Sequence, residues 1–164
     1  MIYNNTLVRR QDRLLEEKEA LALLQEGEYG VLSMVSPEGE AYGIPVNYVW
    51  DGAESIYIHC APEGRKLRSI ASIPQVSFCI VGKTQVVSNQ FTTAYQSIVA
   101  KCHAHTGLSA EERMKALELL LEKYSPNDQI IGRKYAEKSF HRTEIIRLDI
   151  QEISGKCKRI AGIS

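Results

Sequence analysis

Residues 42–66, YGIPVNYVWDGAESIYIHCAPEGRK, decide how this chain folds. Residues 42–50 are apolar or aromatic at nearly every position, which is typical of a strand covered on both faces. Pro45 cannot donate a hydrogen bond to a neighbouring strand, so we expect the pairing to lapse or bulge there and to leave backbone groups free for a ligand. Asp51-Gly52 then predicts a hairpin turn, residues 55–60 predict a returning strand, and Gly64-Arg65-Lys66 predicts the start of a short helix.

Length and composition restrict the class of protein. The 164 residues are 44% hydrophobic, which fits a single domain over residues 1–164 with a sizeable core. Lys and Arg number 20, as do Asp and Glu, so no overall field attracts nucleic acid or an acidic membrane surface. The chain lacks a signal-peptide pattern and any run of about 18 apolar residues, which predicts a soluble, cytoplasmic protein. Its four cysteines show no CxxC spacing and are interpreted as buried thiols.

The rest of the chain predicts an antiparallel α+β barrel with six strands and two firm helices. Gly27 is placed to cap the first helix, Ser109 begins the second, and the phase break at Ile153 suggests a bulge in the last strand. A short helical turn is also possible near Tyr135. The two firm helices cover residues 16–26 and 109–124, and a short helix covers residues 65–72. The expected strands cover residues 29–36, 42–50, 55–60, 75–83, 95–108 and 146–151. Residues 84–93 are expected to form a polar, irregular surface loop or a partner contact.

A phosphate site is the main chemical hypothesis that the residues themselves support. Neither GxGxxG nor GxxxxGK[ST] occurs, which excludes the standard nucleotide-binding motifs. Gly64-Arg65-Lys66 would combine helix-start amides, the helix dipole and two cations, although the same tripeptide also suits a solvated helix cap. The phosphate would lie beyond the strand that carries His59 and beside the strand interrupted at Pro45. A planar ring could then lie against exposed backbone, as in a flavin mononucleotide (FMN) site.

The order of short motifs along the chain resembles the FMN-binding split-barrel proteins of the pyridoxamine 5′-phosphate oxidase-like superfamily. The resemblance is carried by PVNY at residues 45–48, IYIH at residues 56–59, EGRK at residues 63–66 and YQS at residues 95–97. It is closest to the nitroimidazole-resistance (Nim) proteins and covers nearly the whole chain. Cys102 replaces a glycine that such proteins often carry. The substrate-phosphate motif of true pyridoxamine 5′-phosphate oxidases is not visible after Thr143, so that activity is not expected.

The resemblance implies a six-stranded antiparallel split β-barrel with flanking helices, which forms a homodimer with FMN at the subunit interface. Its implied cofactor-binding residues are Pro45, Val46, Asn47 and Tyr48 at the flavin ring, and Gly64, Arg65, Lys66 and Ser97 at the phosphate. His59 would lie near the flavin or its substrate, both as a cofactor-binding residue and as the catalytic candidate. The implied function is an FMN-dependent oxidoreductase that takes electrons from NADH or NADPH and reduces a small planar acceptor such as a nitroimidazole or another nitroaromatic.

Several of these residues also have a structural interpretation. Asn47 could serve the local backbone, His59 could be an ordinary strand residue, and Tyr48 and Trp50 could belong to the core. His103 and His105 share one face of a strand, which could offer two metal or haem ligands, but Lys101 on that face favours a solvated surface and no metal site is predicted. The alternative functions are a non-catalytic flavin- or haem-binding split barrel and a structural dimer with an empty groove.

Overall fold

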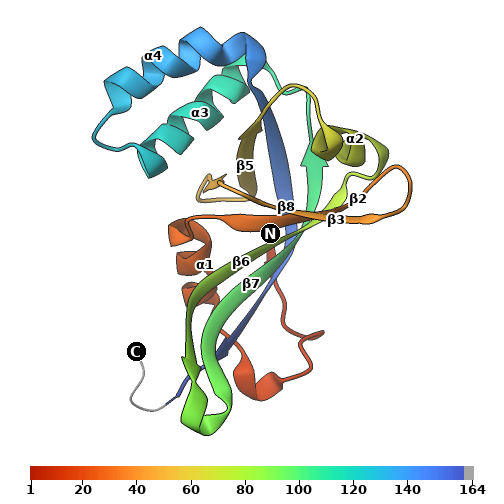
Figure 1. The fold of residues 1–164 in the computed structure, drawn as a ribbon, viewed down its shortest axis with the longest axis vertical. Helices are drawn as coiled ribbons and strands as arrows, with labels where there is room; N and C mark the ends of the chain where they lie inside the picture. Colours follow the sequence, from red (N-terminus) through yellow and green to blue (C-terminus); the bar gives the residue numbers. More distant parts are fainter. Residues whose placement is uncertain (161–164) are drawn as a thin grey trace.

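Eight strands and four α-helices make up residues 1–160, the part of the chain that the computed structural model describes (Figure 1). The strands are β1 (Ile2–Tyr3), β2 (Gly30–Val35), β3 (Ala41–Val46), β4 (Val49–Trp50), β5 (Ser55–Cys60), β6 (Gln75–Val87), β7 (Thr92–His105) and β8 (Glu144–Lys158). The helices are α1 (Glu17–Glu26), α2 (Arg65–Ser72), α3 (Ala110–Tyr124) and α4 (Gln129–Ser139), with short 3-10 helices at Gln11–Arg13, Ser88–Gln90 and Phe140–Arg142. The predicted α+β class is confirmed. The strands beyond the predicted six are the short β1 and β4.

One antiparallel sheet has the strand order β3-β2-β6-β7-β8-β5-β4, and β1 adds a short parallel pairing to β8. Strands β3 and β4 are the two ends of this sheet, yet only Asn47 and Tyr48 separate them in sequence. The chain therefore crosses from one sheet edge to the other in two residues. We call Asn47–Tyr48 the bridge, because it draws the two edges together while the sheet remains open between them.

The sheet encloses the main core with one face and packs against α3 with part of the other. Inward-facing side chains such as Leu32, Phe78 and Ile146 are fully buried, and Ile70 of α2 joins the same core. A smaller core lies between α3 and the outer face, where Tyr57 and Ile145 pack with Ala116 and Leu120. Buried side chains therefore lie on both faces of the sheet where α3 covers it.

The prediction of one doubly covered strand over residues 42–50 is wrong. Strand β3 is an edge strand whose residues alternate between exposed and half-buried, and the chain changes sheet edge at the bridge. Pairing does not lapse at Pro45, which stays in register with Val31. An edge strand tolerates proline because alternate backbone amides face away from the only neighbouring strand. The pairing ends one residue later, after Val46.

The prediction of an irregular loop over residues 84–93 is also wrong. Strands β6 and β7 stay paired as far as Val87 and Thr92 and form a long hairpin that extends away from α3 and α4 (Figure 1). Phe91 turns the chain at its tip with a left-handed φ of 48°. Residues at this end are mostly exposed, so the sequence there has no hydrophobic alternation that would indicate a strand.

Other local predictions are confirmed. Helix α2 has the predicted limits, Gly27 follows α1, and the amide of Glu112 donates to Ser109 Oγ at 3.1 Å at the start of α3. The predicted bulge in β8 exists, because the β7–β8 register shifts between Lys101 and Cys102. The helical turn near Tyr135 is the full helix α4. Among the described residues, no helix has the length and apolar character needed to span a membrane.

Candidate functional site

The start of α2 is a positively charged helix end next to open space. Gly64 precedes the helix with a φ of 141°, and no heavy atom beyond its chain neighbours lies within 4 Å of where a Cβ would be. The first turn contains no acidic residue and begins with Arg65 and Lys66. Unpaired amides, the helix dipole and two cations therefore coincide here, which is the chemistry that a phosphate requires.

The two cations of this turn have different partners. Arg65 forms an ion pair with Glu40 at 3.0 Å, and its guanidinium lies 4.4 Å from the centre of the Tyr42 ring. Lys66 forms no ion pair with any residue between 1 and 160. Arg65 is therefore tied to the β2–β3 hairpin, whereas the charge of Lys66 is uncompensated.

His59 and Cys60 lie close to Lys66 at the end of β5. His59 keeps an exposed surface on the outer face of the sheet, opposite Ile145 of β8. Burial of the rest of the ring and the Lys66 ammonium both lower the pKa of His59. Burial raises the pKa of the Cys60 thiol, and Lys66 opposes that rise. The structure thus brings together His59, Lys66 and Gly64, as the sequence predicted, in a setting that favours neutral imidazole.

The predicted ring-binding residues follow the edge of the sheet onto the bridge. Pro45 is exposed, Val46 packs against the core, and Asn47 is exposed while its amide donates to the Glu28 carbonyl at 3.0 Å. Tyr48 is fully buried, with its hydroxyl donating to the Leu24 carbonyl at 2.7 Å. These bonds give Asn47 and Tyr48 structural roles, and their contact with a flavin stays a prediction.

Ser97 lies apart from the α2 cations within one chain. It faces outward on β7, opposite Val81 of β6. The end of β5 beside Lys66 pairs with Glu144 of β8, whereas Ser97 pairs with Lys156, twelve residues further along that strand, which corresponds to about 40 Å of strand. A contact of Ser97 with a phosphate held by Lys66 would therefore require a second chain.

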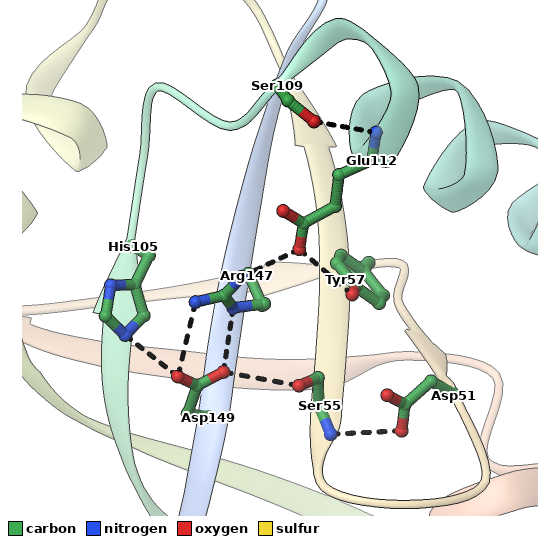
Figure 2. A network of polar contacts seen from close by, with 8 residues as sticks. All are labelled: Asp51, Ser55, Tyr57, His105, Ser109, Glu112, Arg147 and Asp149. Carbon is green, nitrogen blue, oxygen red and sulfur yellow. Dashed lines mark hydrogen bonds and ion pairs between the residues drawn. The ribbon is translucent and has the colours of Figure 1, made fainter.

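A polar network on the outer face connects α3 to three strands (Figure 2). Arg147 of β8 bonds to Glu112 and to Asp149, both at 2.8 Å. Tyr57 donates to Glu112 at 3.2 Å, and His105 Nε2 lies 2.9 Å from Asp149. Each charged group of this network has an opposite partner, so it can hold α3 on the sheet without any ligand.

His103 and His105 lie side by side, with ring centres 4.8 Å apart. His103 Nδ1 is 3.4 Å from the Gln75 amide nitrogen, and His105 is held by Asp149. Within residues 1–160, no three His, Cys, Asp or Glu side chains are grouped to hold a metal ion. The pair shares a face as predicted, and its use as haem ligands stays open.

Two cavities lie away from the predicted site. One, of about 410 Å³, lies on β2, β6, β7 and β8 and includes Ser33, Gln75 and Lys101 in its lining. The other, of about 310 Å³, lies between α3 and α4 and includes Leu121 and Arg133. No predicted cofactor residue lines either of them.

Sheet order and helix placement define the class of this protein as a split barrel. Residues 16–157 match the family model described as pyridoxamine 5′-phosphate oxidase, and the chain belongs to this family. The family resemblance inferred from the sequence is confirmed. The sequence matches none of the curated proteins with which it was compared.

Several solved structures share the fold at low sequence identity. A proposed 5-nitroimidazole antibiotic resistance protein from Bacteroides thetaiotaomicron has 14% identity and a TM-score of 0.71, with 88% of this chain and 86% of that chain covered. The flavocytochrome Anf3 from Azotobacter vinelandii has 15% identity and a TM-score of 0.77, with coverage of 95% and 74%. The FAD and haem binding protein from Mycobacterium smegmatis has 16% identity and a TM-score of 0.71, with coverage of 88% and 72%. These similarities establish the fold, which flavin- and haem-binding proteins share.

Sequence reasoning missed the contact by which Tyr124 of α3 holds the bridge, which we call the Tyr124 clasp. The Tyr124 hydroxyl accepts from the Tyr48 amide at 3.0 Å, although 76 residues separate the two. In the sequence, Tyr124 is only the predicted end of a helix, and no local pattern links it to the bridge. Only the packing of α3 on the folded sheet brings Tyr124 to the bridge.

Proposed function

We propose that this protein is an FMN-dependent oxidoreductase that resembles nitroimidazole or nitroaromatic reductases and acts as a cytoplasmic homodimer. Bound FMN would accept a hydride from NADH or NADPH and pass electrons to a small planar acceptor. The protein's part is to hold, orient and desolvate the flavin. The neighbour described as a nitroimidazole resistance protein supports this choice of acceptor.

The observation that carries the proposal is the uncompensated charge of Lys66 at the start of α2. A charged side chain normally has a partner or full hydration, and here helix-start amides and the open space beside Gly64 adjoin it. Lys66 and the first-turn amides would hold the FMN phosphate. Arg65 would join them by exchanging Glu40 for the phosphate, since both are oxyanions that pair with a guanidinium.

The ring would lie along the sheet edge from Pro45 and Val46 to the bridge. Strand β3 pairs with β2 alone among the described strands, so its other edge can offer backbone groups to the ring. The Asn47 amide nitrogen is already bonded to Glu28, which leaves the Asn47 carbonyl oxygen for the ring. The lowered pKa of His59 favours the neutral ring, so His59 would relay a proton from water to the acceptor, taking one up at one ring nitrogen as the other gives one up.

Exposed apolar side chains support the homodimer. Val35, Val81 and Val99 are 36%, 52% and 41% exposed on the outer face of neighbouring strands. A second chain on this face would bury them and could bring its own Ser97 to the phosphate. The site would then be complete only in the dimer.

An absorption spectrum of the purified protein tests the proposal directly. We expect a flavin spectrum, release of FMN on denaturation, and anaerobic reoxidation of the reduced protein by a nitroimidazole. Reduced flavin that no nitroaromatic reoxidises would contradict the reductase assignment. His59→Gln should slow reoxidation by a larger factor than it weakens FMN binding, with Lys115→Gln on the exposed side of α3 as the control.

A non-catalytic flavin- or haem-binding protein is the second candidate. The adjacent rings of His103 and His105 favour it, as does the haem binding named for the neighbour from Mycobacterium smegmatis. A Soret band that disappears in His103→Gln and His105→Gln would support this candidate. A protein that binds neither FMN nor haem would contradict both.

A further inference from the structure

The last two residues of α3, Lys123 and Tyr124, pack against the bridge. The Tyr124 hydroxyl lies 2.7 Å from the carbonyl oxygens of both Tyr48 and Glu28. A hydroxyl has one proton, so it donates to one carbonyl at a time, and the Asn47 amide already donates to Glu28. The Tyr124 hydroxyl thus holds the backbone of Tyr48 at two points, the Tyr48 amide and the Tyr48 carbonyl.

Lys123 places a buried charge under the same segment. Its Nζ is buried and has no hydrogen-bond partner in the described chain, and it lies 3.9 Å from the centre of the Tyr48 ring. The Tyr124 ring centre is 5.4 Å away. Two aromatic faces compensate part of the desolvation of the ammonium, but no described carboxylate lies within ion-pair distance of it.

Packing alone does not explain a lysine at this position. A methionine has a similar length, would fill the same space against Tyr48 and would leave no polar atom without a partner. The ammonium therefore has a use that an apolar side chain could not serve. Its neighbours are the bridge residues that we assign to the flavin ring.

We propose that Lys123 provides a fixed positive charge beneath the flavin ring and favours the reduced cofactor, which carries more negative charge. The inference rests on the proposed function, because it takes the bridge as part of the ring site. A unit charge within about 10 Å in a protein interior can shift such an equilibrium by about tenfold. Lys123 acts across Tyr48 and is a tuning residue rather than a catalytic one.

The test compares the affinities of the full-length protein for oxidised and reduced FMN at pH 7. Lys123→Met should lower the ratio of reduced to oxidised affinity by about tenfold, whereas Lys123→Arg should keep most of the wild-type ratio. Lys115→Met, on the exposed side of the same helix, is the control for loss of a distant charge. Tyr124→Phe loosens the bridge but keeps the Lys123 charge, so it should weaken both affinities and leave their ratio unchanged.

The ratio separates the proposed role from a purely structural one. If Lys123 only supports the fold, Lys123→Met changes both affinities alike, and an unchanged ratio overturns the inference while the proposed function stands. Should the wild-type protein bind no FMN, the proposed function fails and the inference fails with it.

Discussion

Arg147 and Lys66 are both cations beside the same sheet, but their surroundings differ. Arg147 bonds to two carboxylates, Glu112 and Asp149 (Figure 2). Lys66 has no ion-pair partner among residues 1–160. The Arg147 network is complete within the chain and holds α3 on the sheet. The Lys66 end of α2 lacks a counter-charge. The difference separates charges that stabilise the packing of α3 from the start of α2, where we propose that the ligand binds.

The largest expected effect comes from removing the unpaired cation. Lys66→Ala should weaken FMN binding by about 30-fold, since a charge-assisted hydrogen bond contributes about 2 kcal/mol. Titration with flavin fluorescence as the signal measures the change, and thermal unfolding without FMN should stay near the wild-type value. Unchanged FMN affinity would remove Lys66 from the site.

The reverse result is expected for the paired cation. Arg147→Met leaves the half-buried Glu112 and Asp149 carboxylates without their shared partner, so the free energy of unfolding should fall by about 1.5 kcal/mol. Urea denaturation measures this loss. FMN affinity should not change, and a 30-fold loss like that of Lys66→Ala would break the distinction between the two regions.

A third test of the comparison between paired and unpaired cations is the pH dependence that Lys123 gives to folding stability. Burial lowers its pKa from 10.5 to about 8, so between these values the unfolded chain binds more protons than the folded one. Folding stability should therefore rise with pH across this window, relative to Lys123→Met. After allowance for partial exposure, we expect a relative gain of about 1 kcal/mol between pH 7 and pH 10, measured by urea denaturation. Parallel pH curves for the two proteins would contradict a buried ammonium.

The smallest expected effect on stability is that of Tyr57→Phe. Tyr57→Phe removes one hydrogen bond to Glu112 but leaves the Arg147 ion pairs in place, so the free energy of unfolding should fall by only about 0.5 kcal/mol. The same urea experiment measures it. A loss larger than that of Arg147→Met would show that the ion pairs are not what holds α3.

The sequence predicts those parts of the fold whose signals are local. The Ser109 cap, the limits of α2 and the bulge in β8 each follow from neighbouring residue types. The signal for the proposed phosphate end of the site is equally local, because Gly64 and Lys66 follow closely after the strand that carries His59. These predictions needed no knowledge of which strands pair.

Long-range pairing decides what the sequence could not predict. The apolar run at residues 42–50 indicates a central strand, but its residues serve opposite edges of one sheet. The Tyr124 clasp and the His105–Asp149 contact join residues far apart in sequence. The β6–β7 hairpin is exposed at its tip, so it carries no hydrophobic alternation there.

A binding comparison between FMN and riboflavin tests the central claim most directly. The two share the flavin ring and differ in the phosphate that the α2 cations would hold. We predict that the purified protein binds FMN at least tenfold more tightly than riboflavin, and that Lys66→Ala removes most of this preference. Equal affinity for the two compounds in the wild-type protein would contradict a phosphate site at the start of α2.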